Sequence, residues 1–228
     1  MSKAVWIVTV NYRTAGMVVD CLRSLFAQVQ AGDLGGGRAV VVDNASGDDS
    51  VERVAATISR EGWSGWTEVM PQNSNGGFAY GNNAGIRAAM AADNPPDYLL
   101  LLNPDTVARP GAIRALVDFM EAHPDVGIAG SLLENPAGGV DCSAHRIPSP
   151  LGELAGAARL GPLSRLLHRH AVSPPQRNEA HECDWVSGAS MFIRRQVLEQ
   201  IGPMDEGYFL YFEAVSYTHL TLPTSDLV

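Results

Sequence analysis

The sequence of 228 residues predicts an α/β fold with a mostly parallel central sheet and helices on both of its faces. Two observations lead to this prediction. Short, nearly continuous apolar runs recur along the chain, as expected for strands that are buried on both faces. Each run ends in a polar cluster and is followed by a segment whose apolar residues recur at helical spacing, which is typical of a doubly wound sheet.

Taken in order, four strand patterns each precede a helical pattern. The expected strands cover residues 4–10, 39–43, 67–71 and 98–102, and the expected helices cover 15–29, 48–58, 84–92 and 111–122. Asp48 and Ser50 favour a helix start in the second case, and Pro110 is expected at the first helical position of the fourth. The run 126–130 predicts a further strand.

From about residue 135 to 182 the chain becomes rich in Pro, Gly, Arg and His, and strand-like order returns at 183–195, before a short helix at 195–202. Within this part, residues 150–171 carry leucines at helical intervals beside several arginines. Such a segment favours a surface helix that covers one end of the sheet. The alternative is peripheral contact with an anionic membrane surface.

The charge, the cysteines and the apolar runs of the sequence disfavour several classes of protein. The net charge of −9 argues against a nucleic-acid partner, which requires a basic face to neutralise phosphates. The three cysteines are odd in number and far apart, and they resemble neither a zinc-site spacing nor a disulfide framework, which favours a cytoplasmic location. The N-terminus predicts a strand, not a signal peptide, and no run approaches the ~20 apolar residues of a membrane span.

The polar clusters that follow the predicted strands are the expected binding site, because open parallel sheets bind ligands at the carboxyl ends of their strands. Asn11, Asp43, Asn44, the loop 73–77 and Asp105 all occupy such positions. Neither the dinucleotide fingerprint G-x-G-x-x-G nor the phosphate loop G-x-x-x-x-G-K-S/T is present, which disfavours the two commonest nucleotide-binding modes.

Each cluster has more than one interpretation. Asp43 suits hydrogen bonds from a base or ribose, but the sequence around it equally suits an Asx turn or a helix cap. Gly76 and Gly77 permit close approach of a diphosphate to a helix N-terminus, although this stretch alone favours an ordinary glycine-rich turn. Asp105, just past a buried strand and preceded by Pro104, favours a divalent cation over a simple turn.

Aromatic and acidic residues gather near the end of the chain, at Trp185, Asp205, Tyr208, Tyr211 and Glu213. Flat apolar faces beside carboxylates suit a carbohydrate acceptor, and a buried aromatic cluster is the alternative.

Six ordered motifs together resemble the family 2 glycosyltransferases with the GT-A fold, and most closely their rhamnosyltransferase-like branch. The motifs are VTVNY (8–12), VVDNASGDDS (41–50), NSNGGFAYGNNAGI (73–86), LLLLNPDT (99–106), VSGASMFIRRQVLEQIG (186–202) and MDEGYFLYFE (204–213).

The resemblance implies that a sugar is transferred with inversion from a nucleotide-diphosphate sugar, either dTDP-rhamnose or a UDP-sugar. The implied acceptor is a glycan or a polyprenyl-linked glycan at the inner face of the plasma membrane. Such a transfer belongs to cell wall or polysaccharide biosynthesis. Residues 1–134 would form the nucleotide-sugar half and residues 135–213 the acceptor half. The residues implied at the nucleotide sugar are Asn11, Asp43 and Asn44 at the nucleoside, and Gly76, Gly77 and Asn83 beside the nucleotide and diphosphate. Asp105 would hold Mg²⁺ or Mn²⁺ in the place of the family's D-x-D motif, whose first position is Asn103 here, a further residue implied at the nucleotide sugar.

On the acceptor side the resemblance implies Trp185, Gly188, Asp205, Tyr208 and Tyr211. The catalytic base of the family is an Asp directly after the Glu that corresponds to Glu213, and this chain has Ala214 there. The stretch VSYTHLTLPT resembles a translated transposase end and sequencing adapter. We therefore expect residues 214–228 to be a non-native tail, the acceptor half to be truncated and transfer to be weak.

Two other functions remain open at this point. A sugar nucleotidyltransferase would share the sheet and the metal chemistry, but it would carry a glycine-rich, basic loop after the first strand, where this chain has NYRTAGM. A non-catalytic nucleotide-sugar-binding domain is the second alternative. A processive synthase is disfavoured by the lack of membrane spans and of a Q-x-x-R-W motif.

Overall fold

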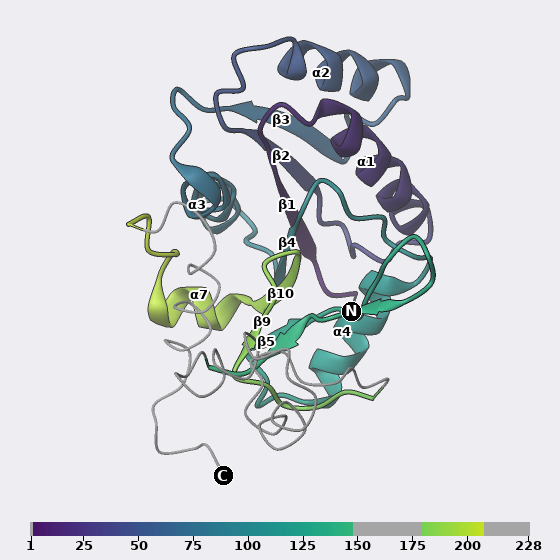
Figure 1. Ribbon diagram of the computed structural model, residues 1–228, viewed down its shortest axis with the longest axis vertical. Coiled ribbons are helices and arrows are strands. Elements are labelled where there is room, and N and C mark those ends of the chain that lie inside the picture. Colours follow the sequence, from purple (N-terminus) through teal and green to yellow (C-terminus); the bar gives the residue numbers. More distant parts are fainter. Residues whose placement is uncertain (1, 148–178, 208–228) are drawn as a thin grey trace, which may run out of the picture.

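A computed structural model describes residues 2–147 and 179–207. Its centre is a six-stranded sheet in the order β3-β2-β1-β4-β10-β5 (Figure 1). The strands of this sheet are β1 (Val5–Asn11), β2 (Ala39–Asp43), β3 (Thr67–Pro71), β4 (Tyr98–Leu102), β5 (Ile128–Gly130) and β10 (Ser190–Arg194). The helices are α1 (Ala15–Gln30), α2 (Ser50–Arg60), α3 (Gly77–Met90), α4 (Ala112–Ala122) and α7 (Arg195–Ile201).

The sheet is mostly parallel, as the sequence predicts. β1 pairs in parallel with β2 and β4, and β2 pairs in parallel with β3. β10 runs antiparallel to both β4 and β5, so β5 points the same way as the first four strands. The carboxyl ends of β1, β2, β3 and β4 therefore meet at one edge.

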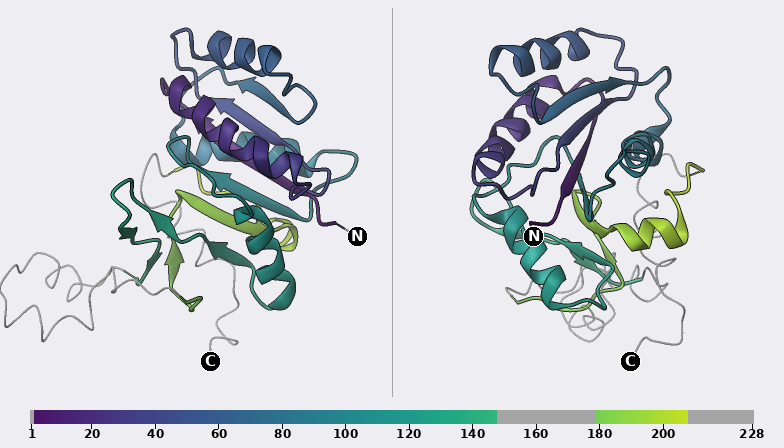
Figure 2. Two further views of the ribbon diagram at one scale, coloured as in Figure 1. Left: turned by 90° about the vertical axis from the view of Figure 1, so that its right-hand side faces the viewer. Right: turned by 180° about the vertical axis from the view of Figure 1, so that it is seen from behind.

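Helices cover both faces of the sheet. α1, α2 and α4 pack on one face and α3 and α7 on the other (Figures 1 and 2). The alternation of side chains along β1 separates two apolar layers, because Val5 and Ile7 join the first layer and Val8 joins the second. Strands buried on both faces explain why the strand segments of the sequence are almost wholly apolar.

α3 differs from its prediction. It begins at Gly77, whereas the sequence favours a loop as far as residue 83 and a helix only from residue 84. Its glycines let the helix lie against the sheet, since a Cβ atom at Gly81 would lie 2.6 Å from a methyl carbon of Val10. Glycines that are typical of a loop thus belong to a closely packed helix.

The start of α4 also differs. The helix begins at Ala112 after Gly111, whose φ of 79° is left-handed, so Pro110 lies before the helix and not at its first position.

The second half of the chain contributes to the same sheet, because β10 inserts between β4 and β5. Two small antiparallel sheets lie beside it: β6 (Leu133–Glu134) with β7 (Val140–Asp141), and β8 (Ala144–His145) with β9 (Trp185–Val186). Three predicted features lie outside the described residues: the segment 150–171, for which the sequence favours a surface helix over membrane contact, the residues Tyr208, Tyr211 and Glu213, and the expected tail 214–228.

Candidate functional site

Asn11 and Asp43 end β1 and β2 at the same register position. The side-chain amide of Asn11 donates a 2.6 Å hydrogen bond to Oδ1 of Asp43, and both side chains are buried. Ser46 joins them, because its hydroxyl donates to Oδ1 of Asp43 at 2.6 Å and its backbone N–H donates to Oδ2 at 3.0 Å. The carboxylate is thereby held in one orientation at the strand-end edge.

The two loops that follow β1 and β2 are bound to each other through this cluster. Arg13 donates its backbone N–H to the Ser46 hydroxyl at 3.0 Å and its Nε to the Ser46 carbonyl at 2.9 Å. Arg13 and Ala45 have φ values of 59° and 53°, a left-handed backbone that is uncommon outside glycine. The surrounding hydrogen bonds therefore hold both loops in sparsely populated conformations.

Asn44 connects the same edge to the N-terminus of α3. Its Nδ2 donates to the carbonyl of Gly77 at 2.7 Å and to Oδ1 of Asn75 at 3.3 Å, and Oδ1 of Asn75 accepts the N–H of Gly77 at 3.0 Å. Gly77 has a φ of 86°, which favours glycine at this position. Oδ1 of Asn44 is buried and has no hydrogen-bond partner among the described residues.

Asp105 lies just past β4 on a well-fixed turn. The backbone N–H of Asn103 donates to the carbonyl of Ala189 at 3.0 Å, and Thr106 donates its N–H and its hydroxyl to the carbonyl of Asn103. The carboxylate of Asp105 is exposed, and within the described residues it makes no hydrogen bond or ion pair. Its oxygens are therefore available to bind a cation or another ligand at the edge where the parallel strands end.

The donor set at Asp105 suits a hard divalent cation that a ligand helps to hold. Among residues 2–147 and 179–207, no group of three or more His, Cys, Asp or Glu side chains is arranged to bind a metal ion. Mg²⁺ and its chemical relatives are commonly bound through one or two carboxylates together with substrate phosphates. The single carboxylate fits that mode and does not fit an all-protein cage.

Cys21 lies beneath this turn, on the buried face of α1. Burial raises the pKa of its thiol to about 11, and the nearby hydroxyl groups of Thr106 and Thr9 act in the opposite direction. Among the described residues, the three cysteines form no disulfide bond. Cys21 therefore supports the turn as a neutral, apolar side chain.

The residues that the resemblance implies on the acceptor side are only partly gathered near this edge. A Cβ atom at Gly188 would lie 3.1 Å from the ring of Phe78, in the first turn of α3, so the two segments are in contact. Trp185 stacks on His145 with ring centroids 4.0 Å apart and donates Nε1–H to the carbonyl of Arg146 at 2.9 Å. Burial lowers the pKa of His145. Asp205 accepts the N–H of Gly207 at 2.8 Å.

Asn83 is fully buried, and its side chain contacts Met204 and Glu206. The sequence places it near the nucleotide, and that role stays a prediction.

The sequence analysis does not single out Ser46 and Asn75, which the structure places in the candidate site. Their spacing in the sequence could have identified them, because a Ser three residues after Asp43 and an Asn two residues before Gly77 are typical of Asx-type turns.

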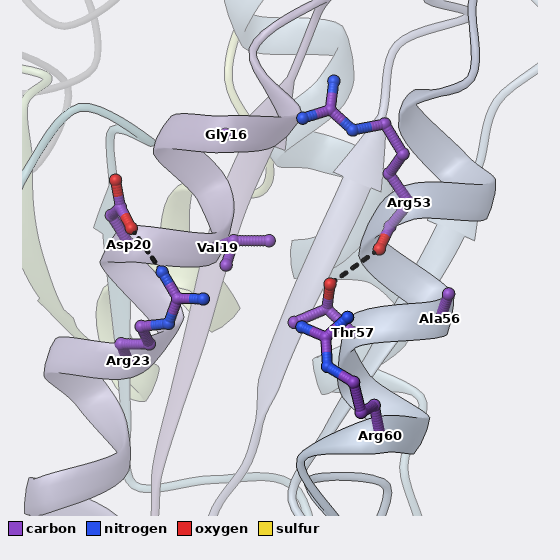
Figure 3. A pocket seen from close by; sticks show the side chains of 8 residues that line it. All are labelled: Gly16, Val19, Asp20, Arg23, Arg53, Ala56, Thr57 and Arg60. Atoms are coloured by element: carbon purple, nitrogen blue, oxygen red, sulfur yellow. Dashed lines mark hydrogen bonds and ion pairs between the residues drawn. The ribbon is translucent and has the colours of Figure 1, made fainter.

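A groove of about 470 Å³ between α1 and α2 lies apart from this cluster (Figure 3). It is lined by Arg23, Arg53 and Arg60, which are more than half exposed, and each of them pairs with an acidic neighbour at 2.8 to 3.8 Å. Exposed and compensated charges of this kind contribute little to binding. The strand-end cluster, which consists of Asn11, Asp43, Asn44, Ser46 and Asp105, is therefore the better candidate site.

The family model of glycosyl transferase family 2 matches residues 5–202. An N-acetylglucosaminyl-diphospho-decaprenol L-rhamnosyltransferase of Mycobacterium tuberculosis is 31% identical over 159 residues, which are 64% of this chain and 50% of the relative. The low-salt glycan biosynthesis hexosyltransferase Agl10 of Haloferax volcanii is 25% identical over 215 residues, 93% of this chain and 60% of the relative. The chain thus spans about half of the length of these curated relatives.

The fold has solved counterparts. The mannosyltransferase PcManGT of Pyrobaculum calidifontis, in complex with GDP-Man and Mn²⁺, superposes with a TM-score of 0.61 at 17% identity, over 96% of this chain and 51% of the other. This likeness confirms the predicted GT-A fold. Within the described residues, no helix is long and apolar enough to cross a membrane.

Proposed function

The chain belongs to glycosyl transferase family 2, and we propose that it binds a nucleotide-diphosphate sugar at the strand-end edge and transfers the sugar to a glycan or polyprenyl-linked acceptor. The observation that carries this proposal is the convergence of three elements at that edge. Asp43 ends β2, Asp105 follows β4, and Asn44 binds the N-terminus of α3. A nucleoside, a diphosphate and a cation each have a suitable partner there.

In this proposal, different residues bind the nucleoside and the diphosphate of the nucleotide sugar and the cation beside them. Asn11, Asp43 and Asn44 take the nucleoside, whose hydroxyl groups suit the carboxylate of Asp43. The diphosphate lies beside Gly76 and Gly77, since the N-terminus of a helix presents free N–H groups and a positive dipole end to an anion. Asn103 borders the diphosphate on the side of β4.

Asp105 holds Mn²⁺ or Mg²⁺, in keeping with its exposed carboxylate and with the Mn²⁺ complex of the structural counterpart. A divalent cation at this place offsets the negative charge that develops on the departing diphosphate. The turn of Asn103 and Thr106 keeps the carboxylate at the strand end while its oxygens stay free to bind.

The finer donor and acceptor assignments rest on the relatives. We propose dTDP-rhamnose as the donor and inversion at the anomeric carbon, in keeping with the rhamnosyltransferase of Mycobacterium tuberculosis. The name of that relative includes a decaprenol-linked acceptor, which supports a polyprenyl-linked acceptor. The proposed acceptor contacts are Trp185, Gly188, Asp205, Tyr208 and Tyr211, with Glu213 beside the base position.

The test is a thermal-shift and calorimetric titration with dTDP-rhamnose, UDP-glucose and GDP-mannose, each with and without Mn²⁺. We expect stabilisation by dTDP-rhamnose that depends on Mn²⁺ and disappears in Asp105→Asn. The matched control is Asp125→Asn, an exposed Asp between α4 and β5, at the opposite edge of the sheet. Equal stabilisation of Asp105→Asn and the unmodified protein would overturn the cation assignment.

A further inference from the structure

Asn83, in the middle of α3, holds a segment that lies 121 residues further along the chain. Its Nδ2 donates to the backbone carbonyl of Met204 at 2.8 Å, and its Oδ1 accepts the backbone N–H of Met204 at 2.9 Å. Nδ2 also donates to Oε1 of Glu206 at 2.8 Å. Both N–H groups of the amide are therefore used, and the side chain is fully buried.

Two further contacts fix the same segment. Arg87, one turn further along α3, pairs with Oε1 of Glu206 at 3.0 Å. The side chain of Met204 is 3% exposed and belongs to the apolar layer under α3 and α7. The hydrogen bond from Asn83 and the pair with Arg87 hold the pKa of Glu206 below its ordinary value. Residues 204–206 are thus attached to α3 through backbone, charge and apolar contacts.

The same helix reaches the candidate site. Its first residue, Gly77, is bound by Asn44, and its second, Phe78, contacts Gly188. Asn83 lies about 9 Å further along the helix axis, given the rise of an α-helix. The views of Figures 1 and 2 agree that the chain leaving α7 turns back and runs beside α3. α3 therefore contacts both the strand-end cluster and the segment that leads to residues 208–213.

We propose that Asn83 is a positioning residue that fixes the start of the acceptor-side segment relative to the donor site, and that it does not itself bind the nucleotide. This inference rests on the proposed function, because it assigns residues 208–213 to the acceptor side. It differs from the sequence-based expectation, which placed Asn83 at the nucleotide. A buried amide with both of its N–H groups engaged has no donor left for a phosphate or a ribose.

The first experiment measures hydrogen exchange of the peptide 203–207 in Asn83→Asp. This variant keeps the size of the side chain but removes both donors and turns a carboxylate toward Glu206 and the Met204 carbonyl. We expect the amide of Met204 to exchange about tenfold faster, with β1 and β4 unchanged. The matched control Glu206→Gln keeps an acceptor for Asn83 and loses only the charge pair, so its Met204 exchange stays within about twofold.

The second experiment compares nucleotide affinity and turnover in the same proteins, with dTDP and dTDP-rhamnose in the presence of Mn²⁺. We expect Asn83→Asp to bind dTDP within about twofold of the unmodified protein and to lower kcat with no change in the donor KM. Unchanged exchange at Met204, an unchanged kcat, or a loss of dTDP affinity that matches the loss of kcat would each overturn the proposal.

Failure of the proposed function gives a different result. If the unmodified protein binds neither dTDP nor dTDP-rhamnose, the donor assignment fails, and with it the role of Asn83 beside the donor. The exchange measurement still shows in that case whether Asn83 holds residues 204–206.

Discussion

Asn11 and Asp43, the last residues of two neighbouring parallel strands, share a 2.6 Å hydrogen bond from the amide of Asn11 to Oδ1 of Asp43. Oδ1 also accepts the hydroxyl of Ser46, whereas Oδ2, among the residues that the structure describes, accepts only the N–H of Ser46. The orientation of the carboxylate is therefore set by the fold, and Oδ2 has the capacity to accept a further hydrogen bond from a ligand.

The first prediction concerns Asp43→Asn. In this variant the side-chain NH₂ group of the new Asn faces either Ser46 or Asn11, which donate hydrogen bonds to the carboxylate of Asp43. Because two donors then face each other, one buried hydrogen bond is lost. We expect the free energy of unfolding to fall by about 1–3 kcal/mol and the affinity for dTDP to fall about tenfold or more. Urea unfolding measures the first quantity, and calorimetric titration with Mn²⁺ present measures the second.

Ser46→Ala is the control for this variant, because it removes the three hydrogen bonds of the Ser46 hydroxyl, with Asp43, Asn11 and Arg13, and leaves the carboxylate in place. The backbone N–H of residue 46 still reaches Asp43, so we expect dTDP affinity within about threefold of the unmodified protein. If Asp43→Asn loses stability but binds dTDP normally, the carboxylate is structural and its proposed nucleoside contact is wrong.

The sequence predicts most of the sheet, because strands buried on both faces are continuous apolar runs. The predicted bounds of β2, β3 and β4 agree with the structure. The position of β10 between β4 and β5 could not be predicted, because strand order depends on the path of the chain and not on the apolar run itself. The start of α3 was missed because the close contacts of Gly81 and Gly85 with β1 are not visible in the sequence.

The sequence predicts the edge of the sheet at which the candidate site lies, but not the tertiary contacts around it. The rule that ligands bind at the carboxyl ends of parallel strands brought Asn11 and Asp43 to one edge, and the structure joins them. The contact of Asn83 with Met204 spans 121 residues, and no local pattern announces it. Interactions that depend on position within an element were therefore predictable, and those that depend on tertiary packing were not.

The second prediction concerns the packing of α3 on β1. A Cβ atom at Gly81 would lie 2.6 Å from a methyl carbon of Val10 and 3.1 Å from Oδ1 of Asn44. We expect Gly81→Ala to lower the free energy of unfolding by about 1–3 kcal/mol, since over-packing forces the helix away from the sheet. Gly16→Ala in α1, where a Cβ meets nothing within 4 Å, should be neutral or stabilising by up to about 1 kcal/mol. Equal melting temperatures for the two variants would contradict this account.

The third prediction concerns Arg194, at the end of β10. Its guanidinium donates to the carbonyls of Met120 at 2.7 Å and Val126 at 3.2 Å, and to the hydroxyl of Tyr98 at 3.0 Å. A lysine has one point charge and cannot reach these separated acceptors. We expect Arg194→Lys to lower the free energy of unfolding by about 2–3 kcal/mol in urea titrations.

Arg23→Lys is the matched control for Arg194→Lys, because Arg23 is 54% exposed and pairs with Asp20 along its own helix. Its cost should stay within about 0.5 kcal/mol. A similar loss in both variants would show that the network around Arg194 adds nothing beyond a surface ion pair.

The fourth prediction concerns the alkaline stability that depends on Cys21. Burial raises the pKa of its thiol from 9.0 to about 11, so the folded state keeps a proton that the unfolded state releases. A raised folded pKa gives a stabilisation that is complete below pH 9 and is lost as the pH rises toward 11. Between pH 8 and pH 10 the free energy of unfolding should therefore fall by about 1.4 kcal/mol through this group.

Cys21→Ala isolates the contribution of this thiol, because alanine is apolar and does not titrate. We expect the variant to be less stable than the unmodified protein at pH 8, since it leaves a small cavity in the core, but to lose less stability between pH 8 and pH 10. Urea unfolding of both proteins at the two pH values gives the difference directly. Parallel losses would mean that the Cys21 thiol keeps a pKa near its ordinary value in the fold, so that the contacts with Thr9 and Thr106 offset its burial.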